Sequence, residues 1–161
     1  GHASLQGARV ENCCFQQSIL WGADLSGLRA AGSFWHDADL SAARLQHADF
    51  SGAVMHRCCL RGVLAAGSVW RQARLVEADF RSSLDQLTDL GGADLAGADL
   101  SFALLQGVQL HGADLRGACL YGANLSNADL QEADLKGCDL RDTSLAGANL
   151  GGALLQDTLL P

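Results

Sequence analysis

Residues 93–100 read Ala-Asp-Leu-Ala-Gly-Ala-Asp-Leu, and this five-residue pattern continues through the rest of the 161-residue chain. Close variants of the pattern stand at 23–27 (ADLSG), 113–117 (ADLRG) and 123–127 (ANLSN). In steps of five from Leu5 to Leu160, every position except Asp85 holds an apolar residue, most often Leu. One phase kept over the whole chain predicts a single domain built from one repeated unit.

A period of five fits neither a regular helix nor a regular strand. In an α-helix, steps of five would spread the Leu residues around every side and leave no buried face. A short extended segment followed by a turn does fit, because each repeat then forms one side of a coil. The central Leu and the residue two before it share the inward side, and the residue between them faces outward. The inward partner is a small residue in every repeat except at Leu28, and Gly, Asn and Asp gather where turns are expected.

These A(D/N)LxG repeats resemble the pentapeptide-repeat family, and the resemblance covers residues 3–160. It implies an all-β solenoid, a right-handed quadrilateral parallel β-helix with four repeats per coil. About eight coils would stack along one axis, each covering the next, as in other solenoids. The core would then contain a ladder of Leu residues and a ladder of small residues.

Two tryptophans support the four-sided wrapping. Ala30 and Ala65 are the only undersized residues at the central position, and Trp35 and Trp70 follow them by one repeat. A large side chain next to a small one keeps the core volume constant. We therefore interpret both tryptophans as buried filler rather than as ligand-binding aromatics.

The pattern breaks at residues 81–88, which read Arg-Ser-Ser-Leu-Asp-Gln-Leu-Thr. Burial of an unpaired Asp costs on the order of several kcal/mol, so we expect Asp85 to face outward. Leu84, together with Leu87, is expected to fill the core instead, in a loop, a bulge or a single helical turn. Because the phase resumes at Leu90, the sequence predicts that this segment replaces repeats without adding residues. It is either a harmless irregularity or a recognition loop.

The charges divide at the same place. Residues 1–80 hold seven Arg and seven acidic residues, whereas residues 81–161 hold four basic and eleven acidic ones, so the second half carries the whole net charge of −7. We therefore describe the single domain, residues 1–161, as an irregular half (3–80), the break, and a regular half (89–160). Residues 1–2, Gly-His, are interpreted as the remnant of a tag.

Stacking the sequence in coils of twenty predicts which outward residues lie above one another. Two acidic columns result: one contains Asp94, Asp114 and Asp134, and the other contains Asp79, Asp99 and Asp139. Neighbouring carboxylates repel by about 1 kcal/mol in water, so such columns do not stabilise the fold. They are either ordinary solvated charges of the repeat or an acidic surface for a basic partner.

Outward apolar residues are a second candidate interaction surface. Leu64, Leu84 and Leu104 are expected to share one column, and Phe34 and Val54 are expected to stack on the side that later carries Asp94. Exposed apolar columns favour docking of a partner, and lateral packing against a loop is the alternative. Together with Asp85 and the two acidic columns, these residues form the candidate interaction surface.

Neither the sequence motifs nor the cysteines and histidines predict a catalytic or metal site. There is no GxSxG, GxxxxGK or HExxH motif, so we expect no enzyme activity and no cofactor. The six Cys match no zinc motif, and adjacent cysteines in an extended segment point to opposite faces, so reduced thiols are expected. His36 and His56 are expected to stack one coil apart, but no further ligands accompany them.

Two functions from different classes remain open. The leading interpretation is a non-catalytic protein-binding or scaffold module, as a domain of a larger bacterial effector or adaptor. The alternative comes from the resemblance: some pentapeptide-repeat proteins mimic duplex DNA and bind DNA gyrase, in quinolone resistance or toxin immunity. The net charge of −7 opposes direct binding to nucleic acid, and Asp, Arg, Gln or Gly interrupts every apolar run before it could cross a membrane.

The ends of the solenoid and its location lead to two further expectations. An open end exposes unpaired backbone edges, so an end-to-end homodimer is expected unless other segments cover the ends. The composition and the free cysteines favour a cytoplasmic protein, with secretion as an effector as the other option.

Overall fold

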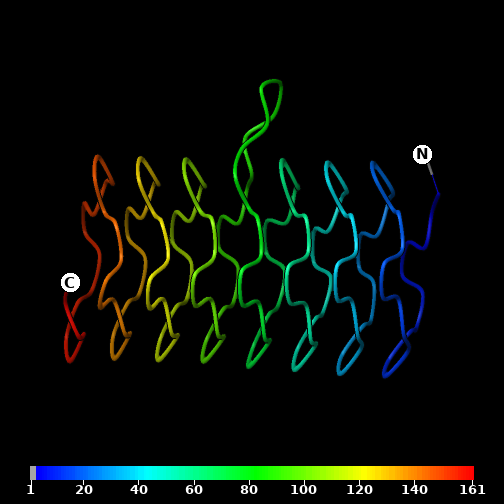
Figure 1. Cartoon of the computed structure of the whole chain (residues 1–161), viewed down its shortest axis with the longest axis horizontal. Helices are drawn as coiled ribbons and strands as arrows, with labels where there is room; N and C mark the ends of the chain where they lie inside the picture. Colours follow the sequence, from blue (N-terminus) through cyan, green and yellow to red (C-terminus); the bar gives the residue numbers. More distant parts are fainter. Residues whose placement is uncertain (1–2) are drawn as a thin grey trace.

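The computed structural model describes residues 3–161 as a straight, four-sided rod (Figure 1). The described part has no helix and no strand longer than one residue, because each repeat pairs with the next coil through a single parallel β-bridge. In most of the chain a bridge joins residues 20 positions apart, as it does for Ser4 and Asp24. Four repeats therefore make one coil, as the sequence predicts. None of residues 3–161 lies in a helix long and apolar enough to cross a membrane.

Each repeat consists of a bridge residue, an inward residue and a tight turn. In one example, the Leu28 N–H donates to the Leu25 carbonyl at 3.1 Å and closes a turn around Ser26 and Gly27. Gly27 has a φ of +64°, the left-handed conformation that a type II turn requires at this position. Thirteen residues other than Gly, among them Phe102 at +58°, adopt the same conformation. The coil therefore imposes the corner geometry even where the residue disfavours it.

The outward Asp and Asn side chains stabilise the turn that follows them. The amide at the first turn position donates to no backbone carbonyl in the described chain. In every repeat with Asp or Asn at the bridge, its Oδ1 accepts this N–H, at distances from 2.8 Å for Asp89 to 3.2 Å for Asp94. This side-chain turn explains why Asp and Asn recur before the central Leu.

The bridge residues define four faces, numbered here in chain order. Face 1 contains Ser4, Asp24, Arg44, Leu64, Asp89, Gln109, Asp129 and Asn149. Face 2 contains Arg9, Arg29, Asp49, Val69, Asp94, Asp114, Asp134 and Leu154. Face 3 contains Cys14, Phe34, Val54, Arg74, Asp99, Cys119, Asp139 and Leu159. Face 4 contains Ile19, Asp39, Cys59, Asp79, Leu104, Asn124 and Ser144.

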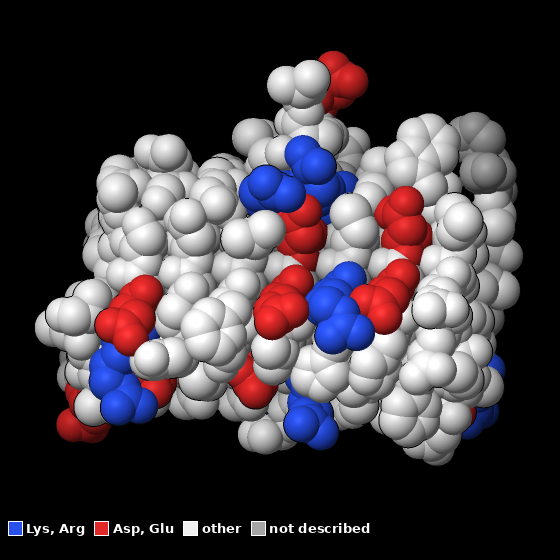
Figure 2. Space-filling view, viewed as in Figure 1, with Lys and Arg blue, Asp and Glu red and all other residues white. Residues whose placement is uncertain are grey.

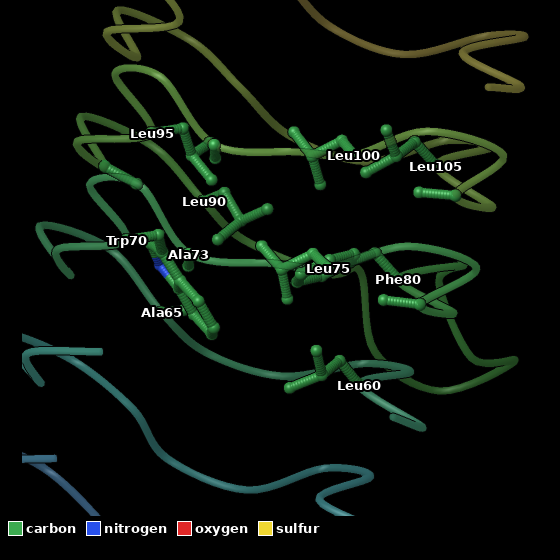
Figure 3. Close-up of a cluster of buried hydrophobic side chains, with 14 of the residues drawn as sticks. Leu60, Ala65, Trp70, Ala73, Leu75, Phe80, Leu90, Leu95, Leu100 and Leu105 are labelled. Carbon is green, nitrogen blue, oxygen red and sulfur yellow. The ribbon is translucent and has the colours of Figure 1, made fainter. Parts of the chain in front are cut away.

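The core is a continuous column of inward side chains along the rod axis, and Figure 3 shows its middle part around Trp70 and Leu75. Trp35 and Trp70 are fully buried, which confirms their assignment as core residues. An aromatic ladder runs through the first half of the core, in which successive rings stack or meet edge-on. It consists of Phe15, Trp35, Phe50, Trp70 and Phe80. From Leu90 onward the central residues are all Leu. Leu28 is also buried, two residues before the small Ala30, so the large and small inward positions are exchanged in that repeat.

The break forms a loop that projects from the corner between face 4 and face 1 (Figure 1). Across this loop the bridges join residues 25 positions apart, as in Leu64 with Asp89 and Asp79 with Leu104. The loop therefore adds five residues to its coil, and the prediction that it replaces repeats was wrong. The inward positions after Phe80 are taken by Thr88 and Leu90, which are both buried. The backbone repeat is equally regular on both sides of the loop.

Candidate protein-interaction site

The loop at residues 81–88 is closed by hydrogen bonds among its own residues. The Ser83 N–H donates to the Gln86 carbonyl at 2.8 Å, and the Gln86 N–H donates to Ser83 Oγ at 3.0 Å. Leu84 and Asp85 lie between these two residues and form the tip. Asp85 is exposed, which confirms that it does not enter the core.

The base of the loop is tied to the rod. Thr88 Oγ1 accepts the Gly62 N–H at 2.8 Å and donates to the Arg81 carbonyl at 3.1 Å. Ser82 Oγ accepts the Thr88 N–H at 3.1 Å and donates to the Gly107 carbonyl of the next coil at 3.2 Å. The tip is therefore presented on a base that hydrogen bonds fix to the rod.

The two leucines of the loop do not fill the core, contrary to the prediction. Leu84 is completely exposed and Leu87 is 57% exposed. The physical reason is that the whole five-residue segment 83–87 is extruded from the coil, so neither leucine lies at an inward position. Both leucines are therefore exposed loop residues and not packing residues of the core.

The added residues also change which outward side chains share a face. Leu64 lies on face 1 between Arg44 and Asp89, whereas Leu104 lies on face 4 next to Asp79, and Leu84 lies on neither face. The predicted apolar column of Leu64, Leu84 and Leu104 is therefore wrong.

The second apolar column is confirmed in part. Phe34 and Val54 do pair across neighbouring coils on face 3, and Phe34 is 41% exposed. The same face continues with Arg74 and Asp99 rather than with Asp94. The predicted continuation was wrong because the loop shifts every later residue by one face.

The acidic columns are confirmed only for the part that lies beyond the loop. Asp94, Asp114 and Asp134 are direct neighbours on face 2. On face 3, Asp99 and Asp139 flank Cys119. Asp79 does not join them, because it lies on face 4 above Cys59. The prediction that Asp79, Asp99 and Asp139 form one column was therefore wrong.

Most of these carboxylates have a basic partner. Arg116 Nη2 lies 2.6 Å from Asp114 Oδ2, Lys136 Nζ lies 3.7 Å from Asp134 Oδ2, and Arg71 pairs with Asp94. The hydrogen bond from the Arg116 side chain holds the pKa of the Asp114 carboxyl below its usual value. The face 2 column is therefore acidic in sequence but largely paired with basic side chains in the structure. On the side of the rod drawn in Figure 2, acidic and basic side chains likewise lie next to one another.

Two exposed aromatic groups were missed by the sequence reasoning. Trp21, 51% exposed, lies on the corner between faces 4 and 1, on the N-terminal side of the loop. Phe102, 50% exposed, meets the Tyr121 ring edge-on at 5.5 Å, and the Arg141 guanidinium lies 5.9 Å from the Tyr121 ring centre. Both Trp21 and Phe102 occupy turn positions, so a period-five analysis that tracks inward residues and bridge residues does not find them.

The cysteines and histidines lie as the repeat predicts. Cys58 and Cys138 are buried, and burial raises the pKa of each thiol to about 12. Cys59, the neighbour of Cys58, faces outward. His36 and His56 lie one coil apart as predicted, and their rings meet edge-on with ring centres 5.2 Å apart. Within residues 3–161 no group of three or more His, Cys, Asp or Glu side chains could hold a metal ion.

Comparison with known families identifies the class of the protein. Eight copies of the pentapeptide repeat match residues 18–57, 86–122 and 118–157, which together cover more than half of the chain. The chain therefore belongs to the pentapeptide-repeat family, and the four-sided rod is its right-handed β-helix. Proteins of this family generally serve as structural or binding modules.

Two solved structures illustrate the likeness. Trypsin-treated QnrB1, a plasmid-mediated fluoroquinolone resistance protein, is 26% identical over 96% of this chain and 85% of its own, with a TM-score of 0.52. HetL, a pentapeptide repeat protein involved in heterocyst differentiation regulation in the cyanobacterium Nostoc sp. strain PCC 7120, is 33% identical over 98% of this chain and 86% of its own, with a TM-score of 0.34. No curated protein sequence matches the chain.

Proposed function

We propose that this chain is a protein-binding module and that the loop at residues 81–88 is its main docking element. The observation that carries the proposal is the complete exposure of Leu84 at the tip of a loop with a hydrogen-bonded base. Binding residues are disproportionately found on loops that a rigid scaffold positions. The rod contributes the rigid support, because its core is continuous from coil to coil.

A loop excision tests this proposal. Removing residues 83–87 joins Ser82 to Thr88 and leaves a regular coil of twenty residues, so the rod should still fold. We expect the full chain to capture a stoichiometric protein partner from cell lysate, and the excision variant and Leu84→Ser to lose it. Phe34→Ser is the matched control, because it removes an exposed apolar side chain from face 3. Retention of the partner by the excision variant would reject the loop as the docking element.

A second candidate function is the inhibition or protection of a type II topoisomerase by DNA mimicry. The likeness to QnrB1 over nearly the whole chain favours it, as does the acidic column Asp94, Asp114 and Asp134. The basic partners of these three residues weaken it, because a mimic of duplex DNA needs unneutralised charge.

The acidic column can be neutralised without removing its turn contacts. Asn124 and Asn149 accept the same turn N–H that Asp accepts elsewhere, so Asp94→Asn, Asp114→Asn and Asp134→Asn together preserve the fold. If the mimicry holds, the full chain inhibits gyrase supercoiling or protects the enzyme from quinolones, and the triple variant loses this effect. Absence of any effect of the full chain on gyrase would exclude the second candidate.

A further inference from the structure

A pocket of about 450 Å³ lies beside the docking loop, at the corner between faces 4 and 1. The loop forms one wall of it with Asp85 and Gln86, and Ser41, Ala42 and Cys59 line it on the side of the rod, where Ser41 Oγ lies 2.9 Å from Cys59 Sγ. Gln86 is held in place because its side chain donates a hydrogen bond to the Gly62 carbonyl. The volume lies within the range of pockets that bind small molecules.

The two ends of the pocket differ in chemistry. Trp21 and Arg61 occupy the same turn position two coils apart, since Ile19 pairs with Asp39 and Asp39 with Cys59. Neighbouring coils are about 4.8 Å apart, so the two residues are separated by roughly 10 Å along the rod. One end therefore presents an indole that is half exposed, and the other presents a guanidinium.

The Arg61 guanidinium has no hydrogen-bonded acidic partner within residues 3–161. Its Nε lies 4.0 Å from Asp79 Oδ2, beyond hydrogen-bond distance. The Asp79 carboxylate is already occupied, because the Arg81 Nε and Nη2 atoms donate to its two oxygens at 2.9 and 2.8 Å. Among residues 3–161 no side chain accepts a hydrogen bond from the Arg61 guanidinium. This group can therefore bind a carboxylate from outside the chain.

We propose that this pocket binds an extended segment of the protein partner that carries a large apolar residue followed three positions later by Glu. In a polyproline II segment, residues three apart lie on the same side and about 9 Å apart, which matches the separation of Trp21 and Arg61. The apolar side chain then packs on the Trp21 indole and Ala42, and the Glu carboxylate binds Arg61. The inference rests on the proposed function, because it names the chemistry of the segment that docks beside the loop.

A short peptide tests the pocket directly. The probe is fluorescein-labelled Gly-Leu-Pro-Pro-Glu-Gly-amide, whose Pro pair favours the polyproline II conformation. We expect fluorescence anisotropy to give a dissociation constant of about 1 mM or tighter for the full chain. Unlabelled peptide should also change the tryptophan emission, because Trp21 is exposed while Trp35 and Trp70 are buried.

Matched variants locate the bound peptide. Arg61→Gln and replacement of Glu by Gln in the peptide should each weaken binding about threefold to tenfold, and the two changes together should weaken it no further. Trp21→Ala should also weaken binding. Phe102→Ala, which removes an equally exposed aromatic ring from another corner, should leave it unchanged.

Two results would overturn the inference. One is a dissociation constant weaker than about 1 mM, or no saturable binding at all. The other is equal affinity of the Gln peptide, or of the Arg61→Gln variant, because binding would then not involve the ion pair. If the peptide fails while loop excision still abolishes partner capture, the pocket is rejected and the docking loop stands.

Discussion

The Trp35 indole Nε1 donates a hydrogen bond to Ser33 Oγ at 2.6 Å, and Trp70 makes the same bond to Ser68 at 2.6 Å. All four side chains are fully buried. Ser33 also donates to the Ala30 carbonyl, so the indole N–H is connected to the backbone through one hydroxyl. Each tryptophan thus carries its own hydrogen-bond acceptor two residues earlier, at the inward position that is usually Ala.

Replacing this Ser should cost stability although the new residue fits. Ser33→Ala introduces the residue that most repeats carry at this position, but it leaves the buried indole N–H of Trp35 without an acceptor. We expect a loss of about 1–3 kcal/mol in the free energy of unfolding, measured by urea denaturation. In a Trp35→Phe background the same change should cost less than about 0.5 kcal/mol, because no donor remains to be satisfied. Equal costs in both backgrounds would refute this account.

The turn-capping role of the outward Asp can be separated from its charge. Asp129 has no ion pair within residues 3–161, and its Oδ1 accepts the Gln131 N–H at 3.0 Å. Asp129→Asn should change stability by less than about 0.5 kcal/mol, since Asn124 makes the same bond at 3.0 Å. Asp129→Ala should cost about 1 kcal/mol, as the loss of a helix N-cap does. Thermal unfolding of the two variants decides whether the hydrogen bond or the charge matters.

Corner glycines differ in what a side chain would meet. At Gly112 (φ +64°) an added Cβ has no neighbour within 4 Å, whereas at Gly122 (φ +65°) it would lie 2.6 Å from the Phe102 ring. Gly112→Ala should therefore cost about 1 kcal/mol for the left-handed conformation alone. Gly122→Ala should cost clearly more, and Phe102→Ala should recover the excess. A similar loss at both glycines in chemical denaturation would show that the Phe102 ring moves away freely.

Acid should destabilise the rod through His56. Burial lowers the pKa of His56 below its ordinary value, assisted by the positive charges of His36, Arg74 and Arg57 and opposed by Asp99. Between the lowered pKa and about 6.5 the unfolded chain binds more protons than the folded chain, so stability falls as the pH drops through this window. His56→Gln should flatten the dependence of the unfolding free energy between pH 7.5 and 5.5, and the exposed His111→Gln should not.

A second acid transition should follow at lower pH. Hydrogen bonds from Ser26 lower the pKa of Asp24, and hydrogen bonds from Arg141 lower that of Asp139. Their stabilising contribution is complete above the unfolded pKa of about 3.9 and is lost as the pH falls below it. The two windows can be told apart in one pH series of denaturation curves.

The five-residue period predicts the fold, and it predicts for nearly every residue whether the side chain faces the core or the solvent, because core packing repeats at each step. The period cannot reveal an insertion of five residues. Such an insertion keeps every inward residue in step, but it changes which outward residues stack on the same face of the twenty-residue coil. The segment 83–87 is such an insertion. For this reason Leu84 was assigned to a column that does not exist, and Asp79 was placed with Asp99. Trp21 and Arg61 line one pocket because they share a turn position two coils apart and the extruded loop lies beside them.

The same insertion leads to a last prediction, that the rod does not need its loop to fold. Ser82 and Thr88 are already in contact, because Ser82 Oγ accepts the Thr88 N–H at 3.1 Å. Excision of 83–87 therefore joins two adjacent residues and places Arg81 and Ser82 at the turn positions of an ordinary repeat. Loop closure entropy changes little for five residues, so the unfolding free energy should stay within about 1 kcal/mol of the full chain.

A second deletion tests whether the excised segment must be five residues long, the length of one repeat. Excision of four residues, 83–86, would move Leu90 off the inward position and turn an outward residue toward the core. It should cost several times more than excision of 83–87, because the register of the whole second half depends on the phase. Circular dichroism and urea denaturation of both variants provide the comparison. Equal stability of the two deletions would mean that the backbone near residue 87 adjusts to a one-residue shift without moving the later repeats. The unbroken five-residue period from Leu90 to Leu160 argues against this outcome.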